Sequence, residues 1–156
     1  MLLLAVLFAL GCGDPRPAGM PKLYPASMVV TLEGQPLEGA MILLHPEDAA
    51  NAPWGPAGQT DSSGIAELRT NARYDGAPLG EYKVVVTKIV MPPHPHPEWE
   101  NLPEGDPNRR KYIAIQDTLR PIEIVDPKYG MVSDTPLRVE ITAKGKTYPV
   151  EVKTKL

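Results

Sequence analysis

Cysteine, aromatic residues and positive charge are all scarce in this sequence of 156 residues. Its single cysteine, Cys12, excludes a disulfide within the chain, so a hydrophobic core alone must hold the fold. A chain of this length buries about two-thirds of its unfolded surface, which makes such a core feasible. The formal net charge of -3 argues against nucleic-acid binding, which needs a clustered basic surface. The length indicates one domain.

Recognisable catalytic motifs are missing as well. The sequence has no Gly-x-Ser-x-Gly elbow, no His-Glu-x-x-His, no Cys-x-x-Cys and no Gly-x-Gly-x-x-Gly fingerprint. It contains three histidines, two of them in one proline-rich segment, so few bases are available to activate a serine. We therefore predict that the protein is not an enzyme and that it uses no cofactor.

No apolar run is long enough to span a bilayer, which takes about 20 residues. Residues 2–10, LLLAVLFAL, instead have the length of the apolar part of a secretory signal. We therefore predict a signal peptide over residues 1–11. Gly11 and Cys12 close it, and residues 12–22 are rich in proline and glycine, as expected of a flexible tether.

The end of the apolar run, Ala9-Leu10-Gly11-Cys12, resembles the lipobox of bacterial lipoproteins. In that motif the cysteine is lipid-modified and becomes the first residue of the mature protein. The usual motif has leucine three positions before the cysteine and a small residue two before it, whereas Ala9 and Leu10 stand there. The resemblance implies lipidation at Cys12 and a cell envelope location, facing the periplasm or the cell surface. The alternative is an unmodified thiol.

Helix signals are weak along the rest of the chain, while short strand patterns recur. Alternating or continuous apolar residues predict strands over residues 27–32, 40–45, 65–70, 82–88, 121–126, 137–142 and 148–153. The continuous run at 40–45 favours a strand covered on both faces. Residues 143–146 are expected to join the last two strands as a hairpin. Six or seven such strands predict an all-β fold, an antiparallel β-sandwich, with a small barrel as the alternative.

Three segments occur in an order that resembles a known family. They are LEGQPLEGAMILLHPE at 32–47, TDSSGIAEL at 60–68 and DGAPLGEYKVVVTK at 75–88. The order resembles the carboxypeptidase regulatory-like, or transthyretin-like, domains, and more closely the small lipoproteins of that type in planctomycete-like bacteria. The resemblance covers about residues 23–156. It implies a seven-stranded, immunoglobulin-like β-sandwich with no known catalytic site.

Residues 89–119 stand apart as a predicted irregular, proline-rich insertion. Six prolines lie between Pro92 and Pro107, and proline favours an extended, exposed chain. Loops longer than about 15 residues are uncommon and are functional or disordered. Trp99 is expected to pin this loop to the sandwich, or alternatively to contact a partner.

Two further groups in the insertion are candidate sites. His94, His96 and Glu98 alternate, so in an extended chain they share one face and could bind Cu²⁺ or Zn²⁺. The alternative interpretation is that these side chains are merely solvated in an exposed loop. Arg109 and Arg110 belong to a short basic cluster that either contacts a partner or is simply solvated.

These features lead to one preferred function and one alternative. The preferred function is a non-catalytic cell-envelope lipoprotein whose β-sandwich is a structural or binding module. Its expected partners are the membrane, through the lipid anchor, and an unknown protein or cell-wall polymer, but not nucleic acid. The alternative is an envelope metal-binding protein that uses the His-Pro-His loop.

Overall fold

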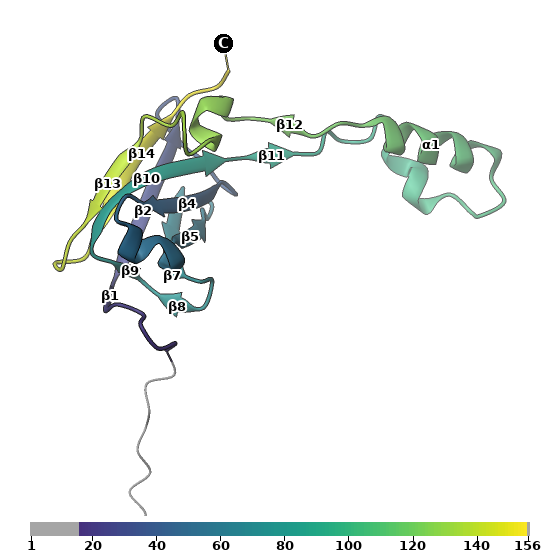
Figure 1. Cartoon of the computed structure of the whole chain (residues 1–156). Helices are drawn as coiled ribbons and strands as arrows, with labels where there is room; N and C mark the ends of the chain where they lie inside the picture. The colour runs from purple at the N-terminus through teal and green to yellow at the C-terminus, as the bar shows by residue number, and fades with distance from the viewer. Residues whose placement is uncertain (1–15, 156) are drawn as a thin grey trace, which may run out of the picture.

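Strands dominate the computed structural model, which describes residues 16–155 (Figure 1). The strands are β1 (Leu23–Tyr24), β2 (Ala26–Leu32), β3 (Gln35–Pro36), β4 (Met41–Pro46), β5 (Pro56–Gln59), β6 (Ile65–Glu67), β7 (Arg69–Thr70), β8 (Tyr74–Asp75), β9 (Ala77–Pro78), β10 (Gly80–Thr87), β11 (Ile89–Val90), β12 (Ile122–Glu123), β13 (Arg138–Ile141) and β14 (Lys146–Val152). The helices are three short 3₁₀ turns, η1 (Ala49–Trp54), η2 (Pro97–Asn101) and η3 (Pro127–Gly130), and one α-helix, α1 (Pro107–Thr118). The predicted all-β class is confirmed.

Two sheets form the body of the molecule. The larger has the strand order β13-β10-β4-β5-β7-β8, and the smaller has the order β14-β2-β3 with β6 also paired to β2. Two strand pairs, β1–β9 and β11–β12, lie outside these sheets. Figure 1 shows β11 and β12 leading away from the body toward α1.

One hydrophobic core joins the two sheets. β2 contributes Met28 and Val30, and β10 contributes Tyr82, Val84 and Val86, all with no exposed surface. Burying a side chain of this size stabilises the fold by roughly 1.5–3 kcal/mol. The strands predicted over 27–32 and 82–88 are confirmed as β2 and β10. The Tyr82 hydroxyl donates to the Pro78 carbonyl oxygen at 2.9 Å, and burial, with a smaller contribution from the Asp48 charge, raises the pKa of Tyr82 to about 12.

Strand β4 departs from the prediction that both of its faces are covered. Ile42 and Leu44 are fully buried, but Met41, Leu43 and His45 are exposed. The continuous apolar run therefore behaves as an alternating strand, because only the inner face of the larger sheet meets the core. The outer face keeps Met41 and Leu43 accessible to water.

The predicted hairpin between the last two strands is wrong. β13 pairs with β10 in the larger sheet, while β14 pairs with β2 in the smaller one, and the turn at 143–145 carries the chain between the sheets. The β2–β14 ladder is parallel, from Lys146 beside Ala26 to Val152 beside Leu32, so the expected purely antiparallel arrangement is also corrected. β14 lies at the edge of its sheet, a position that suits Pro149, because proline has no N–H to donate to a second neighbouring strand.

The insertion is more ordered than the predicted irregular loop over 89–119. It contains the strand β11, the 3₁₀ turn η2 and the 12-residue helix α1, and β11 pairs with β12, which lies within the predicted strand 121–126. The helix begins where Asp106 accepts a hydrogen bond from the Asn108 N–H at 2.7 Å and Pro107 takes the first helical position. Both features favour helix initiation.

No helix within residues 16–155 is long and apolar enough to cross a membrane. The predicted signal peptide, Cys12 and the first part of the tether lie outside the described residues. From Lys22 onward the chain enters β1 and then the smaller sheet.

A buried threonine closes the turn that contains the Thr-Asp-x-x-Gly motif. The Thr60 hydroxyl donates to the Leu37 carbonyl oxygen at 2.5 Å and accepts from the Ala40 N–H at 2.8 Å. Asp61 then accepts from the Ser63 N–H. The motif therefore has a structural role, since it ties the β2–β4 connection to the end of β5.

Replacing Thr60 with valine should destabilise the fold by about 1–3 kcal/mol, because two buried backbone groups lose their partner. Urea denaturation of Thr60→Val measures this change. The control is Thr147→Val, since the exposed Thr147 hydroxyl bonds only Ser27, at 2.9 Å, and its loss should cost less than about 0.5 kcal/mol. Equal effects in the two variants would contradict the structural role of Thr60.

Candidate functional site

The segment 89–123 extends away from the two sheets of the body, and we call it the arm. It leaves the larger sheet at the end of β10 and returns at η3 (Figure 1). Its stalk is the pair β11–β12, in which Ile89 faces Glu123 and Val90 faces Ile122. The Ile124 N–H donates to the Lys88 carbonyl oxygen at 2.8 Å and so continues the ladder into the body.

The tip of the arm consists of η2 and α1 packed against each other. The Arg109 guanidinium reaches across and donates to the Leu102 carbonyl oxygen at 3.1 Å, which ties the first turn of α1 to the end of η2. None of the residues from 89 to 124 is buried, so the tip has no core of its own. Because a helix of 12 residues is marginal alone in water, these local contacts supply its tertiary support.

Four rings gather at the tip. The His96 ring stacks on Tyr112, with ring centres 4.3 Å apart and planes at 10°. Trp99 lies 5.6 Å from His94, and His94 lies 6.0 Å from Tyr112. The rings come from the extended segment, η2 and α1, so this cluster joins all three parts of the tip.

Both nitrogens of the His94 ring are engaged. The His96 N–H donates to Nδ1 at 2.9 Å, so the hydrogen of the neutral ring stands on Nε2, which donates to the Tyr112 carbonyl oxygen at 3.0 Å. Nδ1 also lies 2.9 Å from the His96 carbonyl oxygen, but in this tautomer it has no hydrogen to donate. His94 thus acts as a hydrogen-bonded connector between the extended segment and α1.

The predicted metal ligands are brought only partly together. His96 Nδ1 lies 3.3 Å from Glu98 Oε1, and the rings of His94 and His96 are 6.0 Å apart. No group of three or more metal-ligating side chains occurs within residues 16–155. A metal ion here would have to displace a hydrogen bond of His94, and the metal-binding alternative stays a prediction from the sequence.

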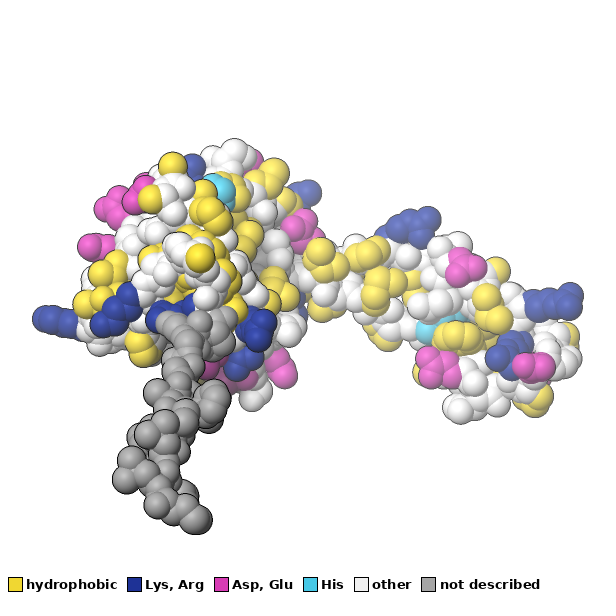
Figure 2. Space-filling model, turned by 60° about the horizontal axis from the view of Figure 1, so that its bottom comes forward, with side chains coloured by type: hydrophobic (Ala, Val, Ile, Leu, Met, Phe, Trp, Pro, Cys, Tyr) yellow, Lys and Arg dark blue, Asp and Glu magenta, His cyan; other side chains and the backbone are white. Residues whose placement is uncertain are grey.

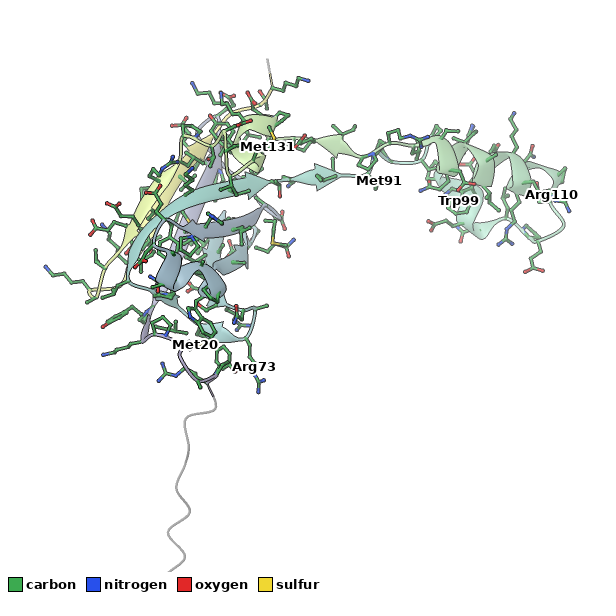
Figure 3. The ribbon with its side chains drawn as sticks, viewed as in Figure 1. Met20, Arg73, Met91, Trp99, Arg110 and Met131 are labelled. Carbon is green, nitrogen blue, oxygen red and sulfur yellow. The ribbon has the colours of Figure 1, made fainter. Side chains whose placement is uncertain are left out.

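The three predicted partner contacts differ in their surroundings. Trp99 is half-buried against His94 in the arm, so the expectation that it pins the loop to the body is corrected (Figure 3). Arg109 is half-buried, and its guanidinium donates a hydrogen bond within the tip, to the Leu102 carbonyl oxygen. Arg110 is exposed and is the most accessible of the three.

The arm also exposes apolar side chains that the sequence analysis did not identify as candidates. Of the nine large hydrophobic residues left exposed in the described part of the chain, four lie in the arm: Ile89, Met91, Ile113 and Ile122. Ile89 is 63% exposed and Met91 is 53% exposed. Figure 2 shows hydrophobic side chains gathered along the stalk. The alternation of Ile89 and Met91 beyond β10 is the sequence signal that could have identified this surface.

The base of the arm is fixed by Asp126. Its side chain accepts from the Lys128 N–H at 3.0 Å, and this hydrogen bond, with the nearby Lys128 charge, lowers the pKa of the carboxyl group. The Asp126 N–H donates to the Lys153 carbonyl oxygen at 2.9 Å. The returning strand of the arm is therefore attached to the end of β14.

Comparison with family models, curated proteins and solved structures gives no match for this chain.

Replacing Tyr112 with alanine should loosen the tip without unfolding the body. An aromatic pair is worth about 0.5–1.5 kcal/mol beyond its buried area, so amide exchange over α1 should accelerate up to roughly tenfold. Hydrogen exchange read by mass spectrometry measures this, and urea denaturation should show little change, because the core contains no arm residue. Lys111→Ala, at an exposed neighbouring position, is the control. Loss of global stability in Tyr112→Ala would contradict an independently ordered tip.

Proposed function

We propose that this protein is a non-catalytic cell-envelope lipoprotein, anchored by lipid at Cys12, that holds out the arm to a partner. In this proposal the body is a seven-stranded β-sandwich of the carboxypeptidase regulatory-like type and serves as the structural module. The partner is a protein or a cell-wall polymer. The observation that carries the proposal is the arm, an extension that contributes nothing to the core and leaves large apolar side chains in water.

The conformational entropy lost in ordering the arm is an argument that the arm binds a partner. Ordering a residue costs about 1–2 kcal/mol of backbone entropy, and an extension without buried residues recovers little of this from hydrophobic burial. The stalk and the residue after β11 nevertheless expose Ile89 and Met91 on one face of the ribbon and Ile122 on the other. Such residues are usual at surfaces that a partner covers. Binding along the stalk would bury them and give the arm the apolar contacts that the isolated chain lacks.

The stalk and the tip have different roles in this proposal. The apolar stalk supplies most of the binding free energy, whereas the tip supplies specificity through Arg110 and Ile113, which are both exposed on α1. Tyr112 and Arg109 face inward and keep the helix in position. The candidate contact residues therefore alternate along α1 with residues that hold the tip together.

Photo-cross-linking in intact cells tests the partner. A cross-linking amino acid placed at Ile113 or Ile122 should give adducts with one and the same partner, identified by mass spectrometry. The control position is Glu151, which is exposed on β14 in the body. Adducts of equal yield from all three positions, or none from the arm, would contradict recognition by the arm.

The anchor is tested by a separate variant. Cys12→Ala should abolish metabolic acyl labelling and release the protein from the membrane fraction, because the nine-residue apolar run at 2–10 is too short to span the bilayer. Labelling by radioactive fatty acid and fractionation of the same cells give both readouts. Membrane retention without any acyl label in the unaltered protein would remove the lipid anchor from the proposal.

A further inference from the structure

Three segments meet where the N-terminal segment enters the body, and we call their surface the tether-end face. They are residues 22–27, 67–76 and 143–147. A Cβ atom on Gly76 would lie 2.5 Å from the Tyr24 carbonyl oxygen, and one on Gly145 would lie 2.9 Å from that of Pro25. The two turns therefore pack directly against the chain at the end of β1 and just before β2. The arm leaves the body elsewhere, beyond β10 (Figure 1).

The tether-end face is basic although the whole chain is acidic. Its three segments hold five basic and two acidic residues, whereas the chain has a net charge of -3. Arg69 is paired with Asp75 at 2.9 Å. Lys22, Arg73, Lys144 and Lys146 are exposed, and none of them forms an ion pair with another residue of the described range 16–155. The face thus has four positive charges without a carboxylate partner among the residues that the structure describes.

Tyrosine rings hold three of these cations in place. Lys22 Nζ lies 5.1 Å from the centre of the Tyr24 ring, and Lys146 Nζ lies 5.1 Å from that of Tyr148. The Arg73 guanidinium lies 5.5 Å from the centre of the adjacent tyrosine ring at position 74. Each of the three cations comes from a different segment of the face. A cation above an aromatic ring keeps its charge toward solvent while its apolar stem is covered.

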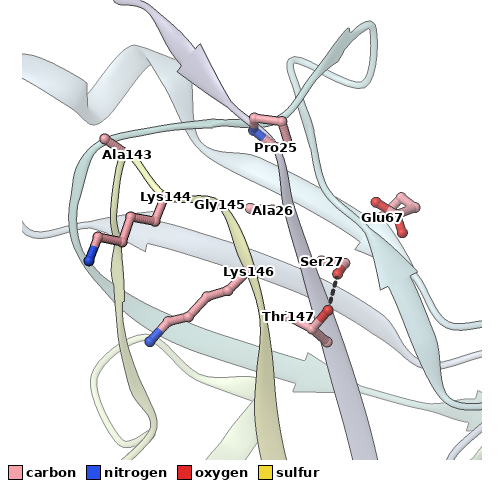
Figure 4. Close-up of a pocket in the computed structure, with 9 residues that line it drawn as sticks. All are labelled: Pro25, Ala26, Ser27, Glu67, Ala143, Lys144, Gly145, Lys146 and Thr147. Atoms are coloured by element: carbon pink, nitrogen blue, oxygen red, sulfur yellow. Dashed lines mark hydrogen bonds between the residues drawn. The ribbon is translucent and has the colours of Figure 1, made fainter.

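The remaining acidic residue of the face, Glu67, lines the same cleft as Lys144 and Lys146 but forms no ion pair with another residue of 16–155. An open cleft of about 470 Å³ lies between the 143–147 turn and the start of β2. Figure 4 shows Lys144 and Lys146 extending to one side of this cleft, while Glu67 stands on the other side of β2. Figure 2 shows Lys and Arg side chains beside the place where the N-terminal trace leaves the body.

We propose that the tether-end face docks on the headgroups of anionic phospholipids in the membrane that carries the anchor. The proposal rests on the lipid anchor of the proposed function. Cys12 lies ten residues before Lys22, so a lipid there keeps the face within about 35 Å of the membrane. Each basic residue close to an anionic surface strengthens the attraction about fivefold, and four such residues without acidic partners act together.

Docking in this orientation gives the body a defined direction. β10 begins at Gly80, next to the β1–β9 pair of the tether end, and runs about 26 Å to the stalk of the arm. The arm therefore starts at the end of the body that faces away from the lipid. The basic face restrains the rotation that a flexible tether alone would allow, and the arm is held above the membrane surface.

Chemical labelling of lysines on the membrane-bound full chain tests the proposal. The processed protein is reconstituted into vesicles of phosphatidylcholine with or without phosphatidylglycerol, and acetylation rates are read by mass spectrometry. On anionic vesicles at low salt, the rates of Lys22, Lys144 and Lys146 should fall at least fivefold relative to Lys128, Lys153 and Lys155. At about 1 M salt, where the Debye length is about 3 Å, the difference should vanish.

A pair of matched variants shows whether charge is the cause. Arg73→Glu with Lys144→Glu should abolish the protection of Lys22 and Lys146 on anionic vesicles. Arg120→Glu with Lys111→Glu makes the same change of charge at exposed positions outside the face and should leave the protection intact. All four positions are exposed, so neither variant removes a core contact.

The possible results separate this proposal from the proposed function. Equal acetylation of all six lysines on anionic vesicles overturns docking by this face, as does protection of the same size on pure phosphatidylcholine. Protection that soluble polyphosphate reproduces without anionic lipid assigns the face to an anionic polymer and also overturns docking on lipid. Release of the protein from vesicles at high salt overturns the anchor, while the low-salt pattern still decides the docking face.

Discussion

The pairing of β10 with its two neighbours is the constraint on which the rest of the structure depends. One edge of β10 pairs with β13 and the other with β4, and its inner side chains Tyr82, Val84 and Val86 are fully buried. The strand connects the β1–β9 pair at the tether end to the stalk of the arm. A shift of β10 by one residue would turn its buried row outward and move both ends of the molecule at once.

The arm continues in the direction of β10 but is held less firmly than that strand. The stalk has only two paired residues on each strand, and an isolated two-stranded ribbon is marginally stable in water. The stable parts of the ladder lie in the body, where the core covers β10. The direction of the arm is therefore set by β10, whereas the short stalk holds the tip only weakly. A partner that binds the arm would order it further. A partner that covers Ile89 and Met91 would extend the apolar environment of the body along one face of the stalk.

Local sequence patterns predict which segments are strands but not which strands pair. The alternation in 26–32, 80–87 and 146–152 agrees with the buried rows of β2, β10 and β14. The parallel pairing of β2 with β14 joins residues 120 positions apart, and nothing in the 143–146 turn distinguishes a hairpin from a crossing between sheets. The apolar run of β4 was misleading for a related reason, because periodicity cannot tell whether a second layer exists above a sheet.

The helix of the arm illustrates a different limit. Asp106 and Pro107 mark its start, yet its apolar residues show no clear periodicity, because α1 buries none of its residues. The clustering of His94, His96, Trp99 and Tyr112 depends on that helix, since Tyr112 approaches the histidines only when α1 folds back over η2. The candidate residues could therefore be identified from the sequence by their residue types. The structure was needed to tell which of them pack within the tip and which face solvent.

The distribution of charge explains why an arm and a basic face can work in one small protein without competing. Residues 89–123 hold six acidic and four basic side chains, so the arm has no net positive charge to attract anionic lipid. At the tether end Lys22, Arg73 and Lys146 lie near tyrosine rings, and within residues 16–155 none of the three forms an ion pair with a carboxylate. An anionic surface therefore attracts the tether end more strongly than the arm, and the apolar stalk is left for recognition by burial rather than by charge.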